Sequence, residues 1–147
     1  MEAEIIAVGT ELLLGSIANT NAQYLSRELA DLGITVQRES TIGDNHDRLA
    51  DFVNEAKRRC DLLVFTGGLG PTYDDMTKET VAGVFGLALE YHPEVMEEIQ
   101  QYFDRVFHRP MPACNRQQAM LPQGCTVLHN PVGTAPGCIF TAGGVTA

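Results

Sequence analysis

Basic residues are scarce in this sequence. Lysine and arginine together number 10 among 147 residues, against 19 aspartates and glutamates, which gives a formal charge of −9. This balance argues against a surface for direct nucleic-acid binding, which needs clustered basic side chains. It leaves open the binding of a small anion, because backbone N–H groups can supply positive potential.

The sequence also lacks closely spaced cysteine pairs and long apolar runs. No two of the four cysteines have C-x-x-C spacing, which argues against a zinc site. Without a recognisable secretory leader, a disulfide framework is not expected either. The apolar runs are too short to cross a bilayer. We therefore expect a cytoplasmic protein with no membrane partner.

Short apolar runs alternate with helical patterns along the chain. The runs predict strands over 3–9, 34–41 and 62–65, with helices starting near residues 19, 45 and 75. A fourth helix starts at Pro93, and its inner face is Val95, Ile99, Phe103 and Val106. This alternation is typical of βαβ units. The sequence predicts one α/β domain over residues 1–147, with a mostly parallel sheet and helices on both faces.

A glycine-rich loop follows the third strand and opens a helix. Gly67, Gly68 and Gly70 let the backbone approach a ligand closely, so that loop N–H groups can surround a phosphate or carboxylate. The loop is neither a Walker A motif nor a G-x-G-x-x-G fingerprint. A tight strand-to-helix turn without a ligand is the alternative interpretation.

Acidic residues lie at the same predicted edge of the sheet. Asp74 and Asp75 follow the glycine loop, and a carboxylate beside a phosphate is costly unless a divalent metal bridges the two. We expect one of this pair to cap the helix and the other to stay free for metal or water. Asp44 follows the second strand, where a helix cap is its expected role. Thr10 and Glu11 follow the first strand and reach the same edge. The four histidines show no metal-ligand spacing.

Five motifs occur in a fixed order along the chain: Gly9–Gly15, Asn19–Ala22, Gly43–Asn45, the loop Thr66–Thr72 with Asp74, Asp75 and Thr77, and Asn130–Gly137. Together they resemble the N-terminal domain of the CinA family of competence/damage-inducible proteins. That domain is itself similar to the MoaB/Mog molybdopterin-binding fold. The resemblance covers almost the whole chain and implies a three-layer α/β/α sandwich with a pocket at the sheet edge.

The resemblance also implies roles for particular residues. It makes Asp75 and Asp44 the catalytic residues, and Asp44, Asp74 and Asp75 the ligands of Mg²⁺ or a similar divalent metal. The activity implied for CinA-type domains is metal-dependent hydrolysis of the ADP-ribose pyrophosphate. The residues expected to bind the phosphate or nucleotide are Gly67, Gly68, Leu69, Gly70, Pro71, Thr72, Thr10, Glu11, Asn130, Gly133, Thr134, Pro136 and Gly137.

Two other functions remain open at this point. One is a non-catalytic module that binds a pterin such as molybdopterin or a nucleotide, and the other is adenylyl transfer to molybdopterin. Family members continue into a Leu-Pro-Gly-Val-Pro stretch and a second domain similar to a nicotinamide-mononucleotide deamidase, so we expect this chain to lack its C-terminal end. A homo-oligomer is expected by analogy with the relatives.

Overall fold

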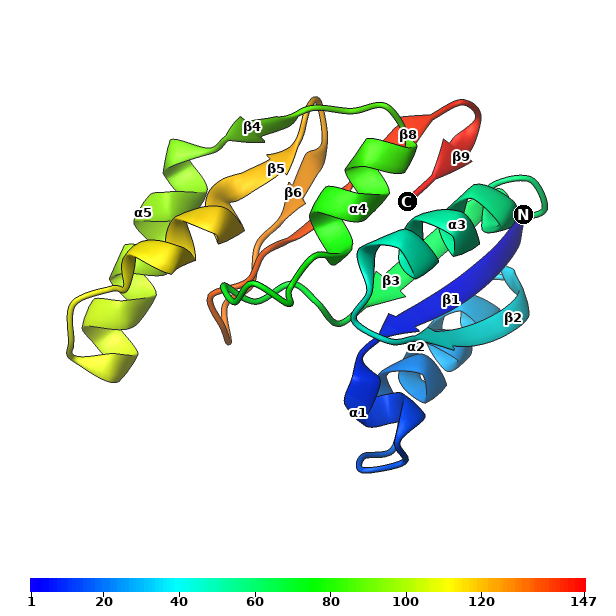
Figure 1. Cartoon of the computed structure of the whole chain (residues 1–147), viewed down its shortest axis with the longest axis horizontal. Coiled ribbons are helices and arrows are strands. Elements are labelled where there is room, and N and C mark those ends of the chain that lie inside the picture. The colour runs from blue at the N-terminus through cyan, green and yellow to red at the C-terminus, as the bar shows by residue number, and fades with distance from the viewer.

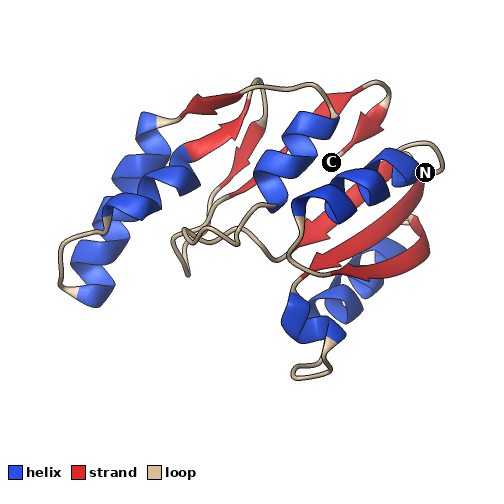
Figure 2. Cartoon of the chain, viewed as in Figure 1, coloured by secondary structure: helices blue, strands red, loops and turns tan.

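The computed structural model describes residues 1–147 and shows an α/β fold around a five-stranded sheet (Figure 1, Figure 2). The strand order is β2-β1-β3-β9-β8; the first four strands run parallel, and β8 is antiparallel to β9. The predicted, mostly parallel sheet is confirmed. The bounds are β1 Glu2–Val8, β2 Thr35–Ile42, β3 Leu62–Thr66, β8 Thr141–Ala142 and β9 Val145–Thr146.

β1 is buried on both faces, which explains its unbroken apolar run. Ile5 packs in a cluster with Leu29 of α2 on one face. Ile6 packs with Leu49 and Val53 of α3 on the other face. The sheet therefore lies between two helical layers, as the three-layer expectation required.

Asparagine caps start two of the helices. The side chain of Asn19 accepts a hydrogen bond from the Ala22 amide at 3.2 Å, and that of Asn45 accepts one from the Arg48 amide at 3.0 Å. Such caps satisfy N–H groups that have no partner inside the helix. The helices are α1 Thr10–Leu13, α2 Thr20–Asp31, α3 His46–Ala56, α4 Thr77–Val84 and α5 Pro93–Tyr102. None of them combines the length and apolar character needed to span a membrane.

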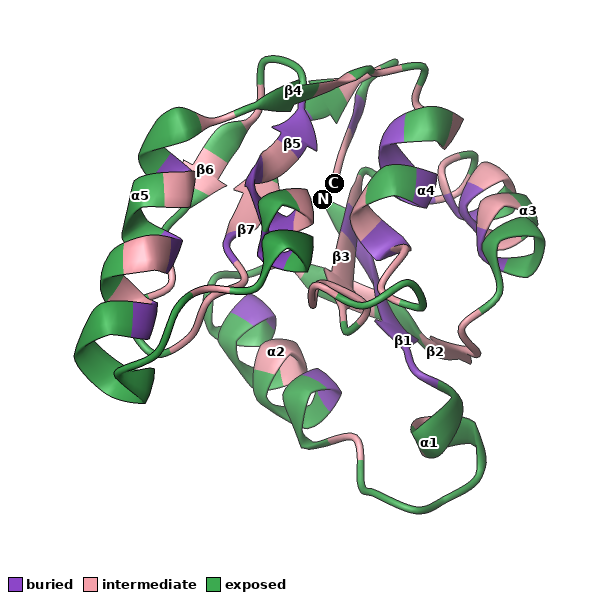
Figure 3. Ribbon diagram, turned by 60° about the vertical axis from the view of Figure 1, so that its left-hand side comes forward, coloured by how far each residue is buried: buried purple, intermediate pink, exposed green.

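A third apolar cluster, separate from those on the two faces of β1, lies beside the sheet, around α5. Figure 3 shows the buried positions of α5 on the side that faces β5 and β6. Cys125 contacts both this cluster and the cluster under α3. This α5 cluster consists of Val95, Ile99, Phe103, Ala119 and Leu121. Its surrounding elements are β4 Leu89–Tyr91 paired with β5 Met120–Pro122, β6 Thr126–Leu128 paired with β7 Gly137–Ile139, and a 3₁₀ helix at Ala113–Ala119.

The expected core face of the fourth helix is wrong at one position. Val95, Ile99 and Phe103 are buried, but Val106 is 46% exposed. After Tyr102 the chain continues as a π-helical turn over Phe103–Phe107, whose wider winding moves the following side chains off the α-helical face.

Candidate functional site

Three strand ends meet at one edge of the sheet, as predicted. β1, β2 and β3 are parallel, so their carboxyl ends lie together. The Gly9 amide donates to the Ile42 carbonyl at 2.9 Å, which joins the turn after β1 to the end of β2. A Cβ atom placed on Gly67 would stand 2.0 Å from the Val8 carbonyl oxygen, so the third turn lies directly against the first.

The glycines of the loop are required by the protein's own packing. Gly67 and Gly68 have φ values of 86° and 63°, in the left-handed region that favours glycine. A Cβ on Gly68 would lie 2.2 Å from the Thr77 hydroxyl oxygen. The Thr77 amide also donates to the Gly68 carbonyl at 3.1 Å, which fixes the loop on the first turn of α4.

The Asp75 carboxylate accepts hydrogen bonds from donors of the loop. Its Oδ2 atom accepts a hydrogen bond from the Thr72 amide at 2.9 Å and another from the Thr72 hydroxyl. Partial burial alone would raise the pKa of Asp75, but hydrogen bonds from Thr72 and from the Gly70 amide outweigh it and hold the pKa below its usual value. The loop therefore gathers donors around a negative group, and in this structure that group is the protein's own carboxylate.

This arrangement corrects the expected capping role of the acidic pair. Met76 is the N-cap residue of α4, and no side chain caps that helix. Asp75 faces back to the loop because Thr72 and Gly70 offer it donors. Asp74 is exposed and forms no hydrogen bond.

Side chains from the 3₁₀ helix at Ala113–Ala119 hold the loop in place. The sequence analysis did not identify these side chains as part of the site. Gln117 donates to the Asp75 carbonyl at 3.1 Å, and Gln118 donates to the Leu69 carbonyl at 3.4 Å. The Lys78 ammonium in turn donates to the Gln117 carbonyl at 2.9 Å. Burial lowers the pKa of Lys78, although nearby thiols and Glu79 oppose the shift. Lys78 could have been identified from the sequence as part of the site, because it is a basic residue shortly after the glycine loop in a chain that has few basic residues.

The space between these groups is small. A cavity of about 20 Å³ is lined by the loop, by Asp75 and Lys78, and by Gln117. That volume holds about one water molecule. An anion the size of phosphate would therefore have to displace the Asp75 carboxylate from the amides.

Asp44 is engaged with the first turn instead of capping α3. Its carboxylate accepts from the Thr10 amide at 2.8 Å, and its own amide donates to the Thr10 hydroxyl at 3.1 Å. The expected cap is wrong because Asn45 takes that position. The carboxylate of Glu11 folds back over Gly9, where a Cβ atom would lie 2.7 Å from it.

No group of three or more carboxylate, histidine or cysteine side chains is placed to hold a metal ion. The proposed set of Asp44, Asp74 and Asp75 is therefore not assembled as a protein-only metal site. Mg²⁺, however, often binds through one or two carboxylates together with substrate phosphates and water. Asp75 fits that pattern, because its pKa is low and it adjoins the amides that would receive a phosphate.

The second predicted binding segment is held against α5, and its end, Pro136 and Gly137, lines a groove together with Leu69 of the glycine loop. Asn130 folds the segment on itself, accepting from the Val132 amide at 3.1 Å and donating to the Ala135 carbonyl at 2.9 Å. Tyr102 of α5 donates to the Val132 carbonyl at 3.0 Å. The structure therefore tethers the segment to α5, and none of its residues lines the small cavity at the loop.

That segment forms its own polar cavity with α5. The cavity measures about 470 Å³, and its predicted site residues are Asn130, Gly133, Thr134 and Pro136. Gly137 begins β7 and faces Leu128. Pro136 and Gly137 also line an apolar groove together with Leu69 of the glycine loop, so the end of the segment approaches the loop, and its role in closing the pocket stays a prediction.

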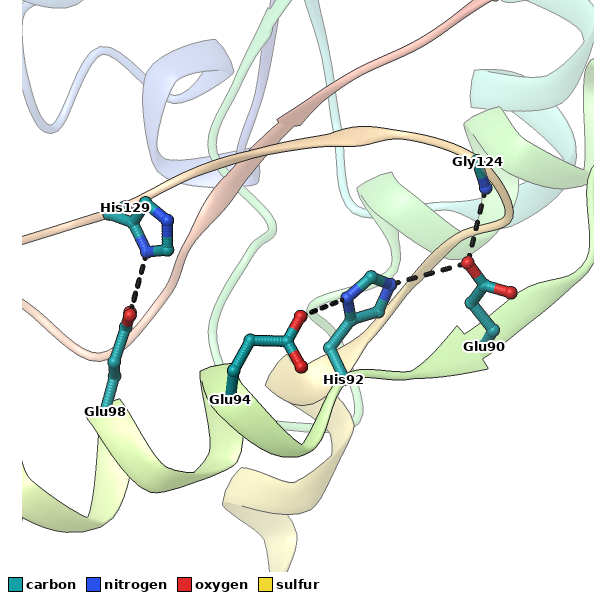
Figure 4. A network of polar contacts seen from close by, with 6 residues as sticks. All are labelled: Glu90, His92, Glu94, Glu98, Gly124 and His129. Carbon is teal, nitrogen blue, oxygen red and sulfur yellow. Dashed lines mark hydrogen bonds and ion pairs between the residues drawn. The ribbon is translucent and has the colours of Figure 1, made fainter.

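Two histidines are fixed by glutamates around α5 (Figure 4). His92 contacts Glu94 at 2.7 Å and Glu90 at 3.7 Å, and His129 contacts Glu98 at 2.9 Å. Each ring has a local carboxylate partner. Neither histidine lines the cavity at the glycine loop.

The fold and the loop together define a class: an α/β protein with a glycine-rich turn at the carboxyl edge of a mostly parallel sheet. The model of the family described as "Probable molybdopterin binding domain" matches residues 4–146, and the chain belongs to that family. It also belongs among the CinA and competence-damage inducible proteins. A CinA-like protein of Trichormus variabilis is 53% identical over 140 residues, which cover 95% of this chain and 33% of the relative.

Other comparisons agree. A competence-damage inducible relative, by its name, from Acetivibrio thermocellus is 56% identical over 95% of this chain and 34% of its own length. The structure of CinA from Thermoplasma acidophilum matches with a TM-score of 0.88 at 34% identity, over 99% of this chain and 84% of that one. MoaB from Thermus thermophilus matches at 0.59 with 18% identity, over 99% and 77%, which shows the shared fold alone. The chain thus spans about a third of the length of these two sequence relatives.

Proposed function

We propose that this domain binds the phosphates of a nucleotide at the loop 67–72 and hydrolyses the pyrophosphate of ADP-ribose with a divalent metal. The observation that carries the proposal is the anionic Asp75 side chain held by the Thr72 amide and hydroxyl, with the Gly70 backbone close enough to help lower its pKa. Amides that already stabilise a carboxylate are suited to a phosphate oxygen, because both are anionic acceptors.

In the proposed reaction, a substrate phosphate takes the place of the Asp75 carboxylate on these amides. The released Asp75 carboxylate would be the residue that holds a divalent metal and orients a water molecule. A divalent ion, when bound, would neutralise charge on the phosphate oxygens. Attack of the water on phosphorus breaks one bond to the bridging oxygen and gives AMP and ribose 5-phosphate. Lys78 keeps the supporting 3₁₀ helix in place through its contact with Gln117.

The direct test is incubation of the protein with ADP-ribose and Mg²⁺, with AMP measured by chromatography. Asp75→Asn is expected to abolish release, and chelation of the metal is expected to do the same. Asp51→Asn removes the same charge from an exposed position on α3 and is the matched control. Absence of AMP from the wild type, or unaltered release from Asp75→Asn, would contradict the proposal.

A non-catalytic binding module for a nucleotide or a pterin such as molybdopterin is the second candidate. It is favoured by the engagement of both candidate catalytic carboxylates within the protein, Asp75 with Thr72 and Asp44 with Thr10. It predicts saturable binding in calorimetry, with the ligand recovered intact after long incubation with Mg²⁺. The homo-oligomer implied by the resemblance stays a prediction, which analytical ultracentrifugation would check.

A further inference from the structure

Lys78 carries a partly buried positive charge that no carboxylate neutralises. Its ammonium donates to the Gln117 carbonyl at 2.9 Å and to the Gln118 carbonyl at 3.4 Å. None of the ion pairs in the structure includes Lys78. An ammonium has three N–H donors, so the two carbonyls leave one donor of Lys78 without a protein acceptor.

This charge is withdrawn from water without an anionic partner. Burial lowers the pKa of Lys78, and the exposed neighbour Glu79 does not offset that effect. Burial disfavours the charged form of a lysine, whereas an anion in contact with the ammonium favours it. The surroundings of Lys78 are therefore suited to an anionic ligand.

The position of Lys78 relative to the glycine loop is fixed by the backbone. Lys78 lies in the first turn of α4, and the Thr77 amide before it donates to the Gly68 carbonyl at 3.1 Å. Lys78 lines the cavity of about 20 Å³ that Gly70 and Asp75 also line. A space of that size holds about one water molecule, so the groups around it lie close together.

The carboxylate now at the loop does not use this charge. Oδ2 of Asp75 accepts from the Thr72 amide and hydroxyl, but Asp75 forms no ion pair with Lys78. A carboxylate has two oxygen atoms in one plane. A phosphate has oxygen atoms in tetrahedral directions, so one of them can accept from an amide while another accepts from an ammonium across the cavity.

We propose that Lys78 makes the site select phosphate over carboxylate, because its third ammonium donor binds an oxygen of the phosphate held by the Thr72 amide. This role rests on the proposed binding of phosphate at the loop 67–72 and does not depend on hydrolysis. It adds ligand binding to the two contacts that Lys78 makes with the 3₁₀ helix. A lysine ammonium is a compact charge and a common partner of phosphate.

The test uses the fact that the chain contains only two lysines. Lys57 donates to the Val84 carbonyl at 3.0 Å, at the opposite end of α4. Labelling of lysine with ¹⁵N at the ζ position therefore gives two NMR signals, one at the candidate site and one internal control. Both are followed through the Hε protons, together with the Thr72 amide, while inorganic phosphate is added to metal-free protein with chelator at constant ionic strength.

The Nζ signal of Lys78 and the Thr72 amide signal are expected to shift with the same saturation midpoint, while the Lys57 signal stays in place. Acetate, the carboxylate probe, is expected to leave Lys78 in place at the same concentrations. Lys78→Met should weaken phosphate binding at the Thr72 amide about tenfold, as expected for the loss of a hydrogen bond between charged groups. Lys57→Met removes a lysine with a similar carbonyl contact and should leave binding unchanged. If Lys78→Met fails to fold, the Nζ signal of the unaltered chain still gives the answer.

The two reporters separate this role of Lys78 from the proposed function. A saturable shift at Thr72 with no shift at Lys78 would overturn the role of Lys78 and leave phosphate binding at the loop intact. An equal shift of Lys78 in acetate would also overturn it, because the charge would then attract anions without selecting phosphate. No shift at either group would overturn both the role of Lys78 and the proposed phosphate site.

Discussion

Replacement of Asp75 by asparagine tests whether the carboxylate competes with phosphate for the loop amides. The side chain keeps its shape and one acceptor oxygen but loses its charge. A hydrogen bond to a charged group contributes about 1.5–3 kcal/mol, and one to a neutral group about 0.5–1.5 kcal/mol. Because Asp75 is partly exposed, solvent screening keeps the difference near 1 kcal/mol. An anion that replaces the side chain should then bind about fivefold more tightly.

The assay is calorimetric titration of ADP-ribose into metal-free protein, with chelator present. Asp74→Asn removes a charge from the neighbouring position, which has no contact with the amides. Its effect measures general charge repulsion and is expected to be smaller. Equal tightening by both variants would refute direct competition, and so would unaltered or weaker binding by Asp75→Asn. With Mg²⁺ present, the same variant is expected to lose hydrolysis, which separates binding from turnover.

Further expected outcomes concern stability and reactivity. Arg59→Ala removes the ion-pair partner of the fully buried Glu4 of β1, leaving it only the hydrogen bond from Ser40, and should lower the free energy of unfolding by about 3 kcal/mol in urea titrations, whereas exposed Arg58→Ala should change it little. Gly67→Ala should destabilise by about 2 kcal/mol or more, because φ is 86° and a β1 carbonyl lies 2.0 Å from the new Cβ; Gly83→Ala, with open space, should stabilise α4 slightly. Burial, aided by a neighbouring thiol, raises the pKa of Cys138 to about 11, so at pH 8 only about one molecule in a thousand carries the thiolate. Iodoacetamide should then label Cys138 slowly in the native protein, faster as the pH rises, and at an ordinary rate after unfolding, as mass spectrometry would show.

Local signals made the first half of the fold predictable from sequence. The apolar run of β1 and the cap residues Asn19 and Asn45 act within a few positions of the chain. Parallel strands then bring the three turns after β1, β2 and β3 to one edge, which follows from topology. The glycine loop was also predictable, because the need for glycine is local: Gly67 and Gly68 adopt left-handed backbone conformations.

Long-range contacts explain what the sequence could not indicate. The loop depends on Gln117, which lies 42 positions from its partner Asp75. The orientation of the Asn130 segment depends on Tyr102 of α5. Asp44 accepts a hydrogen bond from Thr10, whereas the adjacent Asn45, an equally good N-cap residue, caps α3. In each case several donors or acceptors were available, and only the tertiary arrangement selects among them.

The separation of the α5 cluster from the cluster under α3 has a consequence for how the protein unfolds locally. The cluster around α5 contains 5 buried residues and the cluster under α3 contains 10, with Cys125 in contact with both. Regions held by few buried apolar contacts unfold locally at a lower free energy than the whole protein unfolds. The region of α5 can then come apart while the three-stranded body around β1 persists, and the backbone beyond Phe103 would be the first place where a protease finds accessible chain.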